Sequence, residues 1–389
     1  MLNESYFSPV ADTVLAHNAL LSKQALGNQI KVHSIKEGFP EVDEEVRIVI
    51  FGVKENRNDI DYQNEDLSFS EIRTSLYSLY PGSWSSNIVY LGDIQCGNEV
   101  SDTYYAIKDV VSGLISNNMI PIIIGGSQDL TYPVYRAYDE VIPMVNILSI
   151  DRSFDFGNVN SEITNKSYLS KIVIEEPNNL FNYVNLGYQT YFNSQEEIDL
   201  IDKLYFDAIR LGEIASDLRG AEPYLRDANI VSLDLSAIKS QDLGIDKHST
   251  PNGFSSVDAC SLARYAGLSN NVSTFGVFEY SNIKKSKTTG MLIAQIIWYF
   301  IEGVNYRVKD FPDEKIPHQK FIVLVDDQEI IFYKSLKTNR WWVQLPNSAS
   351  DNNKIEKLTL LSCKEADYKM ACNQEIPENY FKALQKALI

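Results

Sequence analysis

The sequence predicts an α/β protein built as a three-layer α/β/α sandwich, in which helices cover both faces of a mainly parallel sheet. Short apolar runs recur along the chain and are separated by segments with helical patterning. The chain has 389 residues, of which 44% are hydrophobic, so it can bury a large core. Strands that alternate with helices need right-handed crossovers and therefore lie parallel. The predicted strands are residues 46–53, 87–93, 120–124, 146–151, 183–189, 207–211, 230–235 and 273–279.

Three of the intervening segments have a clear helical pattern. Residues 71–79 are amphipathic and include Arg73, which we interpret as structural. Residues 103–117 are the predicted crossover before the strand at 120–124. The apolar run at 291–301, MLIAQIIWYFI, is too short to span a bilayer and predicts a buried helix.

Polar residues follow three of the predicted strands at the point where each strand ends. The carboxyl ends of parallel strands meet at one edge of a sheet, which is where α/β proteins gather functional groups. These residues are Gly125, Gly126, Ser127 and Gln128 at the strand 120–124, Asp151, Ser153 and Asp155 at the strand 146–151, and Asp234 and Ser236 at the strand 230–235. A tight turn with no other role is the alternative interpretation of the two glycines. Three such ends on one sheet predict a shared polar site.

The order and spacing of these motifs resemble the arginase, agmatinase and formimidoylglutamase family, the ureohydrolases. That family has a Gly-Gly-(Asp or Gly)-His turn, then Asp-x-His-x-Asp, then Ser-x-Asp-x-Asp, and a Glu on the last core strand. The matching segments here are GGSQ at 125–128, DRSFD at 151–155, SLDLS at 232–236 and Glu279. The resemblance extends over roughly residues 45–305 and implies the same three-layer architecture.

The family's activity depends on two divalent ions, usually manganese, bridged by a hydroxide that attacks a guanidine or amidine carbon. By resemblance, the first ion would be held by Gln128, Asp151, Asp155 and Asp234, with Gln128 where the family has His. The second ion would be held by the shared Asp151 and Asp234 together with Ser153 and Ser236. These serines stand where the family has a His and an Asp. Neutral hydroxyls are poor replacements, so we expect the dinuclear centre to be lost.

Three hypotheses follow for the remaining aspartates: an inactive remnant, a single weakly held Mn, Mg or Ca ion, or residual hydrolysis of an amidine C–N bond. Without a cation the carboxylates would repel one another, which raises their pKa values. A helix amino terminus, bound water or a ligand ammonium could compensate. Arg152 is adjacent, but strand alternation directs it to the face opposite Asp151. We expect a catalytically inactive protein with a structural, ligand-binding or partner-binding role; the alternative is a metal-dependent hydrolase with one ion.

Substrate recognition also differs from the family pattern. Glu279 stands where relatives pair with the substrate's guanidinium, and it leaves an acidic pocket suited to a small cation. The loop after Asp155 offers Asn158 and Asn160 as substrate-binding candidates but contains no histidine. All four histidines lie outside the motif strands; His248 is the one near the predicted pocket edge. A general base that titrates near neutral pH is therefore missing from the motifs.

Composition limits the partners and the compartment. A net charge of −17 disfavours nucleic acid and anionic membrane surfaces as partners. The four cysteines have neither metal-site nor disulfide spacing, which is typical of a reducing cytoplasm. The first residues have no basic segment leading into an apolar one, so no secretory signal is expected. The Asn-, Ile-, Lys- and Tyr-rich composition suggests a bacterial origin.

We predict three parts: a helical lead-in at 1–46, the α/β core at 47–305, and a C-terminal extension at 306–389. The extension is predicted to form a β-hairpin with a polar turn at 326–329, a further strand with exposed Trp341 and Trp342, and a helix after Pro377. Exposed tryptophans favour a contact surface for a protein partner, and packing on the chain's own core is the alternative. The family resemblance implies a homo-oligomer.

Overall fold

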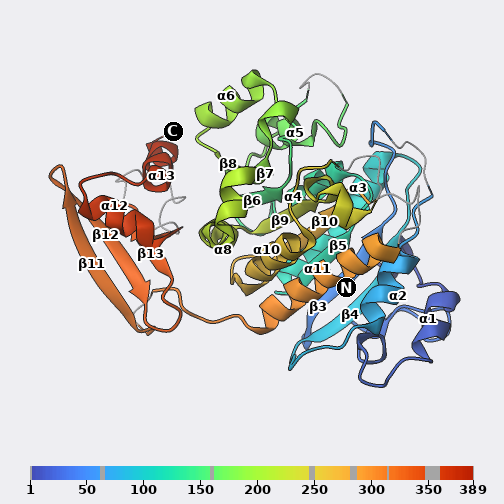
Figure 1. The fold of residues 1–389 in the computed structure, drawn as a ribbon. Coiled ribbons are helices and arrows are strands. Elements are labelled where there is room, and N and C mark those ends of the chain that lie inside the picture. Colours follow the sequence, from blue (N-terminus) through green and yellow to red (C-terminus); the bar gives the residue numbers. More distant parts are fainter. Residues whose placement is uncertain are drawn as a thin grey trace.

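The central sheet has ten strands and runs through the whole core (Figure 1). The computed structural model describes residues 2–61, 66–157, 162–244, 250–280, 287–312, 315–346 and 360–388. The strands are β1 (Phe7–Ser8), β2 (Lys31–Val32), β3 (Val46–Val53), β4 (Asn87–Ile94), β5 (Ile120–Ile124), β6 (Val145–Ile150), β7 (Leu180–Tyr188), β8 (Asp207–Arg210), β9 (Ile230–Asp234) and β10 (Thr274–Phe278).

The strand order is β1-β4-β3-β5-β10-β9-β6-β7-β8, and β2 also pairs with β4. Every pairing is parallel except that of β1 with β4. The predicted mainly parallel sheet is therefore confirmed. The lead-in is not purely helical, because β1 and β2 add short strands beside β4.

Helices cover both faces of the sheet. They are α1 (Asp12–Asn18), α2 (Ser70–Ser78), α3 (Val100–Ser116), α4 (Thr131–Arg136), α5 (Tyr168–Ile174), α6 (Gln195–Lys203), α7 (Leu211–Ser216), α8 (Glu222–Asp227), α9 (Ser240–Leu243), α10 (Ser256–Leu268) and α11 (Lys287–Asn305). Side chains alternate along β3 between two cores. Ile48 and Ile50 pack in a cluster with α2, α10 and α11, whereas Val49 and Phe51 pack in a cluster with α3, α4 and α5. This arrangement is the predicted three-layer sandwich.

The predicted helices lie close to the observed ones. The apolar run at 291–301 lies within α11, whose Ile293, Ile296 and Phe300 are fully buried against the sheet. Arg73 in α2 is buried and ion-paired with Asp93, as expected for a structural residue. Among the described residues, no helix has both the length and the apolar content needed to cross a membrane.

The C-terminal module is a separate antiparallel sheet with two helices, connected to the core by the segment that follows α11 (Figure 1). Its elements are β11 (His318–Val325), β12 (Gln328–Ser335), β13 (Trp341–Gln344), β14 (Leu360–Cys363), α12 (Glu365–Cys372) and α13 (Glu378–Leu388). The hairpin is confirmed: β11 pairs with β12 through a turn at Asp326 and Asp327, both of which have positive φ. The strand β13 and the helix after Pro377 are also confirmed.

The prediction that Trp341 and Trp342 are exposed is wrong. Their exposed fractions are 5% and 2%. Trp341 stacks on both Phe321 and Tyr368, with its ring centroid 5.2 Å and 4.9 Å from theirs, inside the module's own core. Trp342 points the other way along the strand, and Arg226 of α8 lies 4.3 Å from the centre of its ring. The two tryptophans therefore hold the module together and join it to the sandwich.

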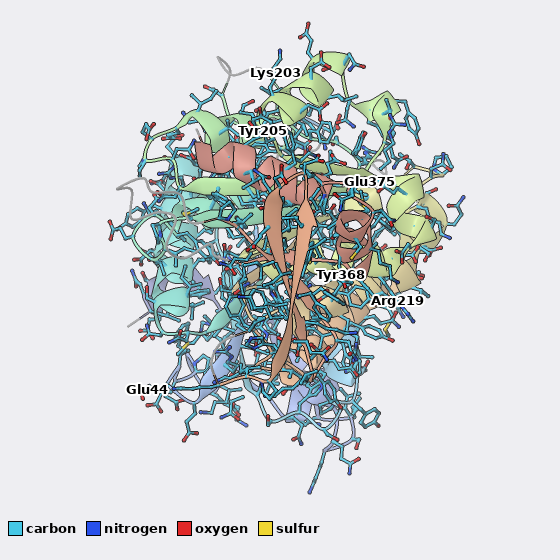
Figure 2. All side chains as sticks on the ribbon, turned by 90° about the vertical axis from the view of Figure 1, so that its left-hand side faces the viewer. Glu44, Lys203, Tyr205, Arg219, Tyr368 and Glu375 are labelled. Atoms are coloured by element: carbon cyan, nitrogen blue, oxygen red, sulfur yellow. The ribbon has the colours of Figure 1, made fainter. Side chains whose placement is uncertain are left out.

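Polar contacts reinforce the junction between module and core. Asp227, at the end of α8, accepts hydrogen bonds from the Ser362 backbone N–H at 2.9 Å and from the Ser362 hydroxyl. The Lys382 ammonium of α13 lies 3.4 Å from Asp207 at the start of β8. Figure 2 looks onto the module from outside, with its long hairpin in front of the sandwich.

Candidate functional site

The carboxyl ends of four neighbouring strands form the candidate site. In the order β5-β10-β9-β6 these strands are adjacent, and each one leads directly into a residue of interest. The segment after β5 supplies Gln128, and Glu279 follows β10. Asp234 ends β9, and Asp151 follows β6. The sheet topology therefore brings together residues that are up to 151 positions apart in sequence.

The Gly125-Gly126 turn has a steric basis. A Cβ atom on Gly125 would lie 2.3 Å from the ring of Phe278, and one on Gly126 would lie 2.0 Å from the Glu55 carbonyl oxygen. Side chains cannot approach that closely, so only glycine permits the chain to turn here. The turn brings the Gln128 backbone N–H to 2.8 Å from Glu279 Oε1.

Three aspartates form a compact buried cluster. Asp151, Asp155 and Asp234 each offer a carboxylate oxygen, and these oxygens all lie within 4.8 Å of one another. All three side chains are buried. Burial, together with the charges of Asp234 and Asp155, holds the pKa of Asp151 well above its usual range. Burial also raises the pKa of Asp155, although a nearby ammonium opposes the increase. Such a cluster needs a cation.

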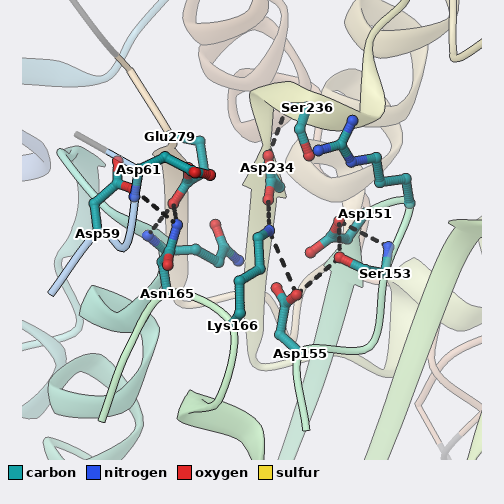
Figure 3. Close-up of polar contacts among 12 residues, drawn as sticks. Asp59, Asp61, Asp151, Ser153, Asp155, Asn165, Lys166, Asp234, Ser236 and Glu279 are labelled. Atoms are coloured by element: carbon teal, nitrogen blue, oxygen red, sulfur yellow. Dashed lines mark hydrogen bonds and ion pairs between the residues drawn. The ribbon is translucent and has the colours of Figure 1, made fainter. Parts of the chain in front are cut away.

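The cation is Lys166, which comes from the same chain (Figure 3). Its Nζ lies 3.5 Å from Asp155 Oδ1 and 3.9 Å from Asp234 Oδ2, and 27% of the side chain is exposed. Burial by itself would lower the pKa of the Lys166 ammonium, but the charges of Asp155, Asp234 and Asp151 raise it above its usual value. The ammonium therefore stays charged near neutral pH and balances part of the negative charge.

The two serines that stand at expected ligand positions donate hydrogen bonds to the aspartates. The Ser153 hydroxyl donates to Asp155 Oδ1 at 2.8 Å, and the Ser153 backbone N–H donates to Asp151 Oδ1 at 3.0 Å. The Ser236 backbone N–H donates to Asp234 Oδ1 at 2.5 Å. The guanidinium of Arg152 lies 4.6 Å from the centre of the Phe192 ring.

Gln128 and Glu279 belong to a second, neighbouring network. The Gln128 amide donates to Ser232 Oγ at 2.8 Å and to the Tyr168 hydroxyl at 3.4 Å. Asn165, next to Lys166, donates to Glu279 Oε1 at 3.2 Å. Glu279 is buried with positive φ, and burial holds its pKa well above the usual range. In Figure 3, Glu279 and Asn165 lie beside Lys166, on the side opposite Asp151 and Asp155.

Comparisons with known proteins agree with the geometry of this sheet edge. Residues 47–302 match the arginase family profile. The chain belongs to the arginase family. This match runs from β3 nearly to the end of α11, and it leaves out β1, β2 and the C-terminal module.

Solved structures with the same fold include three ureohydrolases. Formimidoylglutamase from Bacillus subtilis superposes with a TM-score of 0.64 at 15% identity, covering 73% of this chain and 92% of that one. Formiminoglutamase from Trypanosoma cruzi with Mn2+ superposes with a TM-score of 0.64 at 15% identity, covering 73% of this chain and 99% of that one. Agmatine ureohydrolase of Thermoplasma volcanium gives 0.57 at 18% identity, covering 75% and 97%. Among curated proteins, no sequence gave a significant match.

The donor set of this arginase-family member does not fit two metal ions. Two of the expected ligand positions carry hydroxyls, and the Ser153 hydroxyl is already bonded to Asp155. The Lys166 ammonium lies beside two of the three carboxylates that an ion would need. Several buried oxygens of the site have no hydrogen-bond partner in the described chain, among them Asp151 Oδ2, Asp155 Oδ2, Asp234 Oδ2, Gln128 Oε1 and Ser236 Oγ. One ion would find oxygen ligands here only if Lys166 moved away.

The sequence motifs located the three aspartates, both serines and Glu279, but they missed Lys166 and Asn165. Asn158 and Asn160, predicted to bind substrate, lie outside the described residues, as does His248. Lys166 follows Asp155 by eleven positions in a polar segment and carries no periodic signal. The sequence offers one indication of such a lysine, because three buried carboxylates need a positive charge nearby. A lysine side chain is long enough to reach them from a loop.

Proposed function

We propose that this chain is a catalytically inactive member of the arginase family, in which the Lys166 ammonium provides the positive charge that metal ions supply in active relatives. The observation that carries the proposal is the position of Lys166 Nζ, 3.5 Å from Asp155 and 3.9 Å from Asp234. The protein then has a structural or binding role that depends on the fold.

An ammonium can replace the charge of a metal ion without replacing its chemistry. Lysine offers donated hydrogen bonds and one positive charge, and it has no open coordination position. Hydrolysis of a guanidine or amidine needs an activated water, which two metal ions generate by lowering its pKa. An ammonium held by carboxylates does not do this. The acidic residues would remain because they and Lys166 balance one another in the buried site.

Proton transfer is also poorly supported at this site. His33 lies at the β2–β4 side of the core, where its Nδ1 contacts the Leu91 carbonyl, and His318 begins β11 in the C-terminal module. His17 belongs to α1. No histidine of the described residues reaches the aspartate cluster. This favours a structural or binding role, and since Lys166 already fills the cationic position, it disfavours capture of a small external cation there.

The test is a turnover assay with formimidoylglutamate, agmatine and arginine in excess Mn2+. Ammonia, formamide and urea are measured, with Asp234→Ala as the matched control. We expect no product above the level of Asp234→Ala. Mn2+-dependent product that Asp234→Ala abolishes would overturn the proposal.

The alternative is a hydrolase that uses a single ion, and the unbonded buried oxygens of Asp151, Asp155 and Gln128 favour it. It requires Lys166 to leave the cluster when the ion enters. Removal of the lysine side chain should then leave hydrolysis unchanged or increase it. If Lys166→Met is as inactive as the parent with Mn2+ present, this alternative fails.

A further inference from the structure

A cavity of about 220 Å³ lies between the C-terminal module and the amino-terminal ends of strands in the central sheet, opposite the ends that carry the aspartates. Its core side is formed by the amino-terminal ends of β6, β7 and β8 and by the end of α8. Its other side is formed by β14, α12 and α13 of the module. The aspartate cluster lies at the carboxyl ends of the strands, so this cavity is a separate site.

The charged groups around the cavity are unequally paired. Lys382 is ion-paired with Asp207 at 3.4 Å and with Glu378 at 2.9 Å. The Asp227 carboxylate is bonded by Ser362. The two remaining ammonium groups, Lys364 and Lys386, make no ion pair within the part of the chain that the structure describes. The charge of Lys364 nevertheless acts on Asp367, a fourth carboxylate that lines the cavity.

The positive charge of the Lys386 ammonium is only partly balanced by its surroundings. Its ammonium contacts the side-chain oxygen of Asn182 and lies 5.9 and 5.7 Å from the centres of the Phe181 and Phe206 rings. Burial lowers the pKa of Lys386 to about 8, and the charge of Asp207 offsets this only in part. An ammonium has three donors, and one neutral acceptor leaves two for a ligand.

The rest of the lining combines apolar side chains with polar ones, among them Asn146, Asn379 and Asp367. Ile147 and Phe181 on the core side face Met370 and Ala383 on the module side. Ligand sites usually combine an apolar wall with a small number of polar groups that fix orientation. A volume of about 220 Å³ suits a small metabolite.

We propose that this cavity binds a small organic anion whose carboxylate or phosphate group contacts Lys386 and whose apolar body packs on Phe181, Ile147 and Met370. Because the ligand touches both sides, it holds the module on the sandwich. A compound that binds the folded protein alone raises the unfolding temperature in a saturable way. The proposal is independent of the aspartate cluster, so Lys166 variants retain this binding.

The test is titration of the full chain with hexanoate and with hexyl phosphate, followed by calorimetry and by the unfolding temperature. Hexanamide serves as a neutral compound of similar length, and inorganic phosphate as an anion without an apolar body. We expect saturable binding of at least one organic anion, none of hexanamide, and weaker binding of inorganic phosphate. The two organic anions distinguish a carboxylate site from a phosphate site.

Variants locate the binding. Lys386→Met keeps the length of the side chain without its charge and should weaken the organic anion at least tenfold. Lys369→Met, an exposed lysine on α12, should bind as the parent does. Ala383→Leu fills the cavity while keeping every charge, and it should also abolish binding. Absence of saturable binding to either organic anion, or equal affinity in the parent and Ala383→Leu, would overturn the proposal.

Discussion

At the scale of single residues, one lysine accounts for how three buried carboxylates are tolerated. Isolated buried charges are costly, and carboxylates brought within 4.8 Å of one another add repulsion. Lys166 Nζ contacts two of them, and the backbone N–H groups of Ser153 and Ser236 donate to two. The fold therefore keeps the acidic cluster of the family in balance with groups of its own.

Replacing Lys166 by Met should destabilise the protein strongly, because three buried carboxylates lose their ammonium. Breaking a buried ion pair from one side costs about 3–5 kcal/mol, and the 27% exposure of Lys166 places the expected loss of unfolding free energy near the lower end. Urea unfolding at pH 7 measures it. Lys171→Met, an exposed lysine of α5 paired with Glu175, is the control and should change stability by less than about 1 kcal/mol. Equal stability of the two variants would show that Lys166 does not compensate the cluster.

The sequence predicted the convergence of Asp151, Asp155 and Asp234 because each follows a recognisable apolar strand, and strand ends meet at one edge. It could not predict Lys166. A loop side chain is placed by tertiary contacts, and no repeat or spacing rule relates it to residues on other strands. Neighbourhood in sequence directed attention to Arg152, which instead lies over Phe192.

At the scale of elements, the C-terminal module packs on the sandwich through buried side chains. β13 places Trp341 in the module's core and Trp342 at the junction. The hairpin was predictable from two apolar strands around a polar turn. The strand β14 and the helix α12 were not predicted, because segments of four and eight residues give little periodic signal. Exposure of the tryptophans was misjudged because alternation assigns faces within a strand but does not show that both faces are covered.

Trp342→Ala should weaken the attachment of the module. Truncation of a buried tryptophan typically costs about 3–5 kcal/mol, and here it also removes the ring that Arg226 covers. Limited proteolysis should show earlier cleavage near residues 306–317, and urea unfolding should show a lower free energy of unfolding. Leu324→Ala, on an exposed position of β11, should stay within about 0.5 kcal/mol of the parent. If the two variants behave alike, Trp342 does not hold the junction.

The burial of the Asp227 carboxylate at the junction predicts that the stability of the protein depends on pH. Burial raises the pKa of Asp227 to about 6, above the unfolded value of about 3.9. The protonated carboxyl therefore favours the folded state below about pH 4, and this contribution is lost as pH rises through 6, by up to roughly 3 kcal/mol. Because Asp227 is partly exposed, solvent screening reduces this contribution to stability. The variant Asp227→Asn removes the titration and keeps an acceptor for the Ser362 N–H.

Unfolding free energies of the parent and Asp227→Asn should therefore differ in their pH dependence. From pH 4 to pH 8 the parent should lose at least about 1 kcal/mol relative to the variant. A difference between the two proteins that stays constant over this range would mean that Asp227 has no raised pKa in the folded state.

At the scale of the whole molecule, the chain combines an arginase-family sandwich with a C-terminal module that lies outside the family match. The sandwich has three buried aspartates at the carboxyl ends of its strands, and the module encloses a cavity at their amino-terminal ends. Residues 1–46, which also precede the match, extend the sheet with β1 and β2. Both ends of the strands thus carry polar groups, and an external ligand is expected only at the end that faces the module.

The measurement that tests the central claim most directly is metal content. The parent, Lys166→Met and Asp234→Ala are incubated with excess Mn2+ and Mg2+, dialysed, and analysed by plasma mass spectrometry. We predict well below one equivalent of metal per chain in the parent and in Asp234→Ala, and uptake of a single ion by Lys166→Met, whose carboxylates have lost their ammonium. Two equivalents of Mn2+ in the parent, or one that Asp234→Ala removes, would contradict the account, because Lys166 would then not occupy the place of a metal.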